Sequence, residues 1–293
     1  MIPTPVLKRR HLLAAGGALA LAAAPVPTFA ATDAQIRRKI NLAGRQRMLS
    51  QRMSKAAFFT ALEVEASRHK SMMGEAHTLF DQTLSGLTSG DAELGLPGEQ
   101  NEIVLESLHS VQRLWDVFGP LMAEVVARGG ASESEISTIA RMNTGLLFAS
   151  DNVVKQLVSE YGSTTTELGL AISINVAGRQ RMLSQKMAKE TALIALGYDS
   201  QSNRATLRET TRLFDNSLTA LIDGLPSISL PAPPDHIRLK LQEVKSIWAD
   251  LKNICFEIEG GKEVDAFDLT AVASQTDPLL VTMNDAVTLY EQL

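Results

Sequence analysis

Two nearly identical stretches, 134 positions apart, constrain the fold of this 293-residue chain more than any other feature of its sequence. INLAGRQRMLSQRMSK covers residues 40–55, and INVAGRQRMLSQKMAK covers residues 174–189. Three further pairs of blocks align at this offset or at one residue less: Leu79-Phe80-Asp81 with Leu213-Phe214-Asp215, Trp115 with Trp248, and Leu146-Leu147 with Leu279-Leu280. Because separated blocks recur in the same order, the sequence predicts a tandem duplication, with one unit at 33–161 and the other at 166–293.

Each unit has the pattern of a helical bundle. Apolar residues recur at helical spacing from 35 to about 67 and again over 101–126, and strand signals are nearly absent. Ser132, followed three residues later by Glu135, predicts a capping box at the start of another helix. Residues 162–164 contain no proline, so the sequence permits a continuous helix between the units. The predicted fold class is all-α: two tandem antiparallel four-helix bundles related by internal duplication.

The first thirty residues have the composition of a signal peptide. A basic start, Lys8-Arg9-Arg10, precedes the apolar stretch 12–25 and a small-x-small sequence that ends at Ala30. The apolar stretch is shorter than the ~20 residues that a transmembrane helix needs, so we expect cleavage rather than an uncleaved anchor. We expect export to the periplasm, by the twin-arginine or the general secretory route, and no stable membrane insertion after cleavage.

Charge and cysteine content exclude several classes of function. Loss of the three basic residues of the signal peptide lowers the formal net charge from −5 to −8. Such an acidic body argues against binding to nucleic acid or to an anionic membrane surface. Cys255 is the single cysteine, so no intrachain disulfide is expected. Glu106-x-x-His109 lacks the counterpart that a di-metal bundle would need, and we expect no catalytic residues, no metal and no cofactor.

A helical wheel divides the repeated segment into two stripes. One is an ordinary apolar core face, and the other, roughly opposite, contains Gly44, Arg47 and Gln51, repeated as Gly178, Arg181 and Gln185. Glycine in mid-helix costs about 1 kcal/mol relative to alanine, and it lets a backbone or a ligand approach closely. An arginine one turn away offers a planar set of donors to an oxyanion. Two such half-sites predict a binding site for a small anion between two equivalent helices.

A second interpretation of this stripe needs no ligand. The glycines would then permit close packing of two helices, and the arginines would pair with acidic residues, as arginines on long helices commonly do. Arg45 and Arg179 point to a different side of the helix, and we expect them to be structural or ion-paired.

The segment N-x-A-G-x-x-R-M-x-S at 41–50 and 175–184 resembles the P-box of nitrate/nitrite sensor kinases. It is more similar to the PilJ-type N-terminal domain of type IV pilus methyl-accepting chemotaxis transducers. The resemblance implies a periplasmic helical bundle with one nitrate or nitrite bound between two first helices. It assigns the glycine of the box to Gly44 and Gly178, and its arginine to Arg47 and Arg181.

The chain departs from that family pattern, because its two bundles are fused and no transmembrane or signalling segment follows them. We therefore expect an exported soluble sensor for a small oxyanion, nitrate or nitrite first, that signals through a membrane sensor or transporter protein. The alternative is a ligand-free interaction or dimerisation module of a pilus or chemosensory system. The two halves of the site would meet within a monomer, as an internal pseudo-dimer, or across a homodimer.

Overall fold

The computed structural model describes residues 31–162 and 165–293, and residues 31–293 form one compact unit. The predicted signal peptide and positions 163–164 of the link lie outside the described residues. The helices are α1 (Asp33–Ala61), α2 (Ala66–Ser89), α3 (Glu102–Arg128), α4 (Glu133–Tyr161), α5 (Thr165–Ala195), α6 (Ser200–Asp223), the 3₁₀ turn η1 (Pro226–Ile228), α7 (Asp235–Glu259) and α8 (Ala266–Glu291).

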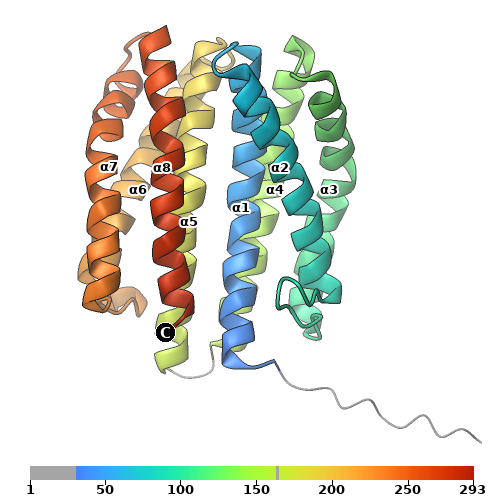
Figure 1. The fold of residues 1–293 in the computed structure, drawn as a ribbon, viewed down its shortest axis with the longest axis vertical. Helices are drawn as coiled ribbons and strands as arrows, with labels where there is room; N and C mark the ends of the chain where they lie inside the picture. Colours follow the sequence, from blue (N-terminus) through green and yellow to red (C-terminus); the bar gives the residue numbers. More distant parts are fainter. Residues whose placement is uncertain (1–30, 163–164) are drawn as a thin grey trace, which may run out of the picture. The chain divides into compact units, whose positions relative to one another are not determined.

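These helices form two four-helix bundles, which confirms the predicted fold class. Each helix of the first bundle packs against the next, and α4 closes the bundle against α1; helices α5 to α8 repeat this order. The two bundles meet chiefly where α1 packs along α5, and these two helices lie side by side between the remaining ones (Figure 1). The duplicated segments are therefore neighbours within one chain.

Capping and backbone geometry set where the helices begin and end. The predicted capping box of Ser132 and Glu135 starts α4. The expected helix from 35 to about 67 is wrong at its end, because Glu63 and Glu65 adopt left-handed φ values of 58° and 46° and the chain turns there. Helix α4 ends at Tyr161, and Gly162 has a non-helical ψ of 65°, so the helix does not run on at that residue.

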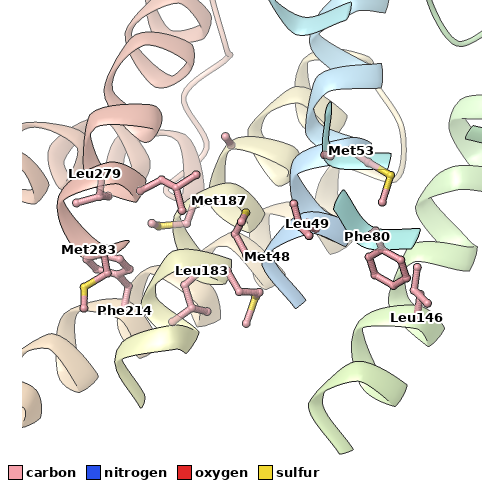
Figure 2. Close-up of a cluster of buried hydrophobic side chains, with 14 of the residues drawn as sticks. Met48, Leu49, Met53, Phe80, Leu146, Leu183, Met187, Phe214, Leu279 and Met283 are labelled. Carbon is pink, nitrogen blue, oxygen red and sulfur yellow. The ribbon is translucent and has the colours of Figure 1, made fainter. Parts of the chain in front are cut away.

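The core of each bundle is built from equivalent residues. Figure 2 shows apolar side chains on α1, α2 and α4 and their counterparts on α5, α6 and α8. The equivalent buried side chains are Leu49, Met53, Phe80 and Leu146 in one bundle and Leu183, Met187, Phe214 and Leu279 in the other. Their burial explains why these blocks survive in both copies, since losing a large core side chain costs about 2–5 kcal/mol.

The Leu-Phe-Asp block and the tryptophan of each unit are joined by an aromatic contact and a hydrogen bond. Phe80 stacks on Trp115 with ring centroids 4.3 Å apart, and the indole nitrogen of Trp115 donates to Asp81 at 2.8 Å. In the second bundle the indole nitrogen of Trp248 donates to Asp215 at 3.0 Å. The aspartate thus satisfies a donor that packing against the core would otherwise leave unpaired.

We expect Asp81→Ala to lower the free energy of unfolding by about 1–3 kcal/mol, because the buried indole N–H of Trp115 would lose its acceptor. Urea denaturation of wild type and variant measures the change. Asp116→Ala is the matched control on the exposed face of α3, with an expected effect within about 0.5 kcal/mol. Equal losses for the two variants would contradict this role of Asp81.

Candidate functional site

The second stripe of the repeated segment lies in the contact between α1 and α5. Gly44, Arg47 and Gln51 are buried in α1, and Arg181 and Gln185 are buried in α5. Arg47 is 0% exposed and Arg181 is 1% exposed, which is rare for arginine. The stripe is therefore a helix-packing face and not a solvated one.

The two guanidinium groups converge on the space that the glycines leave between the helices. A Cβ at Gly44 would lie 3.2 Å from Nη2 of Arg47 and 3.8 Å from Nη2 of Arg181. A Cβ at Gly178 would lie 3.3 Å from Nη2 of Arg181 and 3.6 Å from Nη2 of Arg47. Each arginine thus reaches across to the other helix, and a side chain at either glycine would be tight against the guanidinium of its own helix and in van der Waals contact with the other.

Arg47 has partners from two other helices. Its Nη1 donates to Asp151 of α4 at 2.7 Å and to the side-chain oxygen of Asn175 of α5 at 3.0 Å. Its Nη2 donates to the backbone oxygen of Asn175 at 3.3 Å. This arginine is therefore held by one carboxylate and by one residue of the opposite repeat.

Arg181 has the same arrangement with one chemical difference. Its Nη2 donates to the side-chain and backbone oxygens of Asn41, at 2.8 and 3.3 Å, and its Nη1 donates to Asn284 of α8 at 2.8 Å. Asn284 is the equivalent of Asp151, 133 residues later. An amide therefore stands where the first repeat has a carboxylate, and in the described part of the chain Arg181 has no ion-pair partner.

This substitution leaves the site with excess positive charge. Burial, together with the neighbouring charges of Arg47 and Arg45, lowers the pKa of Arg181 to about 9. Burial also lowers the pKa of Arg47 to about 10, although Asp151 acts in the opposite direction. Arginine stays protonated in proteins, so the lowered pKa values reflect two buried cations that one carboxylate does not fully offset.

The arginines also keep unused hydrogen-bond donors. Among the described residues, the buried Nε atoms of Arg47 and Arg181 have no hydrogen-bond partner. A buried donor without an acceptor is costly, and a donor on a cation is satisfied best by an anion. The arrangement can therefore accept a small anion, provided that the guanidinium groups shift to admit it.

Among the described residues, the glutamines of the stripe make hydrogen bonds to residues other than the two arginines. Gln51 donates to Asn143 of α4 at 2.8 Å, and Gln185 donates to the backbone oxygen of Thr276 of α8 at 3.3 Å. They link each central helix to the last helix of its own bundle. Arg45 donates to Thr83 at 2.9 Å, and Arg179 lies 3.8 Å from Asp151, so both have structural partners.

Four further residues belong to the site. Asn41 and Asn175 lie one turn before the glycines, a position from which the sequence allows either support for the site or a plain surface amide, and each accepts a hydrogen bond from the arginine of the opposite repeat. Asp151 and Asn284 could have been found by aligning the last helices of the two units, since they occupy equivalent positions. Their importance shows only when α4 and α8 are placed beside the arginines.

Comparison with known proteins finds one family. The family model described as "Type IV pili methyl-accepting chemotaxis transducer N-term" (PilJ) matches residues 32–141 and 163–266. The two matched segments begin near the starts of the two bundles and confirm the resemblance drawn from the repeated segment. No curated protein sequence matches the chain. Within the described ranges, no helix combines the length and the apolar character that a membrane span requires.

We expect Asn284→Asp to raise the free energy of unfolding by about 1 kcal/mol at pH 7, because it supplies Arg181 with a carboxylate at a partly screened position. Contact with a cation lowers the pKa of such a carboxyl group. The gain is therefore present above the unfolded-state pKa of about 4 and is lost as the pH falls below it. Urea denaturation at pH 7 and pH 3 measures both effects.

The mirrored variant Asp151→Asn is the control. It removes the carboxylate that Arg47 contacts and is expected to lower stability at pH 7. If Asn284→Asp left the free energy of unfolding at pH 7 unchanged or lowered it, that result would contradict the inference that the site carries excess positive charge.

Proposed function

Because the chain belongs to the PilJ family of type IV pili methyl-accepting chemotaxis transducer N-terminal domains, we propose that it is a sensory domain for a small oxyanion bound between α1 and α5. The observation that carries this proposal is the pair of buried guanidinium groups that converge beside Gly44 and Gly178. Nitrate and nitrite are the proposed ligands. The residues proposed to hold them are Arg47 and Arg181, with the two glycines giving access.

The charge of the site favours a monovalent anion. In the described part of the chain, only Arg47 of the two arginines contacts a carboxylate, and Asp151 is shared with Lys155 and Arg179, so the site keeps positive charge that a nitrate or nitrite ion would offset. Asn284 is exposed, so the end of Arg181 that contacts it is near solvent. A planar oxyanion there would meet planar guanidinium donors, which suits the geometry of arginine better than that of lysine.

Binding would act on the contact between the two bundles. A bound anion would offset the repulsion between Arg47 and Arg181 and tighten the packing of α1 against α5. Gln51 and Gln185 would carry a shift of either central helix to α4 and α8. A membrane sensor or transporter protein would then bind the altered surface of the bundles.

Export to the periplasm belongs to the same proposal. The basic and apolar pattern of residues 1–30 supports it, with Ala31 as the first mature residue. Mass spectrometry of the protein recovered from a periplasmic extract is expected to show a chain that begins at Ala31. Recovery of the uncleaved chain from the membrane fraction would contradict this part of the proposal.

Isothermal titration with sodium nitrate and sodium nitrite, against chloride at equal ionic strength, tests the ligand. Binding to wild type is expected, together with a rise in the melting temperature, because a ligand that binds only the folded state stabilises it. Asn284→Asp and Arg181→Met are expected to weaken binding at least about tenfold, since the first gives Arg181 a counter-ion within the protein and the second removes the cation.

Arg212→Met, on the exposed face of α6, is the matched control and is expected to bind as wild type does. The ligand-free alternative predicts a different result. If folded wild type bound neither anion, and if Arg181→Met changed the sedimentation coefficient, the stripe would be an interaction face and not an anion site.

A further inference from the structure

A pocket of about 300 Å³ lies between α4, α5 and α6, apart from the arginine pair. Its polar lining includes Lys186, Lys189 and Glu190. Lys189 and Glu190 are buried, with exposed fractions of 6% and 1%. Charged side chains are almost never buried unless they are paired, so this pocket needs an explanation beyond packing.

The duplication supplies a comparison for each residue of the pocket. Positions in α5 correspond to positions 134 residues earlier in α1, and positions in α8 to positions 133 residues earlier in α4. The contacts follow this register: Gln51 bonds to Asn143, and Gln185 bonds to Thr276, which is the equivalent of Asn143. The equivalent of the pocket can therefore be identified between α8, α1 and α2.

At the equivalent position, between α8, α1 and α2, a carboxylate of the protein occupies the space. Asp277 of α8 lies 3.0 Å from Lys55, 3.3 Å from Arg52 and 2.6 Å from Arg68. Lys55 is completely buried, and Asp277 provides its anion. One carboxylate thus contacts three cations at this position.

In the pocket, the lysine remains and the carboxylate is missing. Thr144 occupies the position of Asp277, while Lys186 and Lys189 occupy those of Arg52 and Lys55. Lys189 donates to the side-chain oxygen of Asn143 at 2.9 Å and has no ion-pair partner among the described residues. Burial lowers the pKa of Lys189 to about 8, with the charge of Glu190 acting in the opposite direction.

Smaller side chains open the space around this lysine. Four residues that line the pocket replace larger ones of the first half: Leu193, Ser202, Asn203 and Thr206 stand where the first half has Phe59, Arg68, His69 and Met72. In the first half these positions are filled, for example by the stack of Phe59 on His69 with ring centroids 4.9 Å apart. A cavity therefore lies between α4, α5 and α6, where the equivalent position between α8, α1 and α2 is packed.

Glu190 adds a second unsatisfied group. It replaces Ala56 of the first half, and its Oε1 accepts hydrogen bonds from Lys186 and Thr210. Its Oε2 has no hydrogen-bond partner in the described part of the chain. The pocket thus offers a cation that lacks an anion, beside a carboxylate oxygen that lacks a donor.

We propose that this pocket binds a small carboxylate that also carries a hydroxyl or amino group. The ligand's carboxylate lies against Lys189, as the side chain of Asp277 of α8 lies against Lys55 of α1 at the equivalent position. Its hydroxyl or ammonium group donates to Oε2 of Glu190. Leu147 and Leu193 line the remainder and suit a short alkyl group. This second site goes beyond the oxyanion site, and it uses none of the residues proposed to hold nitrate.

Isothermal titration of the full chain with L-lactate, L-alanine and propionate tests the proposal. Lactate or alanine is expected to bind, and propionate, which lacks the donor, is expected to bind about tenfold more weakly. Equal affinity for propionate would overturn the role assigned to Glu190. Failure of all three probes to bind folded wild type would overturn the proposal.

Thr144→Asp and Thr144→Asn form a matched pair of variants. The aspartate places beside Lys189 the carboxylate that Asp277 provides at the equivalent position, so binding of the carboxylate probe is expected to fall at least tenfold. The asparagine has nearly the same size without the charge and is expected to retain binding. Lys189→Met is expected to abolish it. Melting temperatures confirm that each variant is folded.

These variants test the two proposed sites independently. Thr144→Asp is expected to leave nitrate binding unchanged, and Asn284→Asp is expected to leave binding of the carboxylate probe unchanged. Loss of carboxylate binding in Asn284→Asp, with binding retained in Thr144→Asp, would place the ligand at the arginine pair and overturn the second site.

Discussion

The packing of α1 against α5 buries two guanidinium groups in one contact, and the rest of the structure is arranged around that burial. Each arginine lies beside two glycines, and a Cβ at either glycine would be tight against the guanidinium of its own helix. Each is held by an asparagine of the opposite repeat, so neither half of the site is complete without the other. A buried cation is costly without anions and acceptors around it, and the flanking helices α4 and α8 supply these only in part.

Duplication alone would have produced a symmetric protein. Both proposed binding sites depend on where the copies have diverged. Asp151 corresponds to Asn284, so one arginine has a carboxylate and the other has an amide. Asp277 corresponds to Thr144, so one buried lysine has an anion and the other lies in an open pocket. In both pairs the cation is retained in both copies while the carboxylate is present in one. The position that has the carboxylate shows which chemistry the equivalent position lacks.

Much of the architecture could be predicted because it depends on local pattern. Helical spacing, the capping box at Ser132 and the recurrence of separated blocks all reflect interactions within a turn or within one bundle. The turn at Glu63 could not, because glutamate disfavours positive φ, and only the packing of α2 against α1 makes the chain adopt it. The equivalent position in the second half is Gly197, for which such a φ carries little strain.

The sequence by itself determined that the chain is a helical duplication and that each first helix carries a glycine and an arginine on a face separate from its core. It could do so because periodicity and repetition are properties of the chain alone. The tertiary structure decided that these faces meet each other within one chain, which residues of α4 and α8 stand beside the arginines, and that one half holds a pocket where the other is packed. These outcomes depend on contacts between residues more than a hundred positions apart, and those contacts exist only when the bundles are assembled.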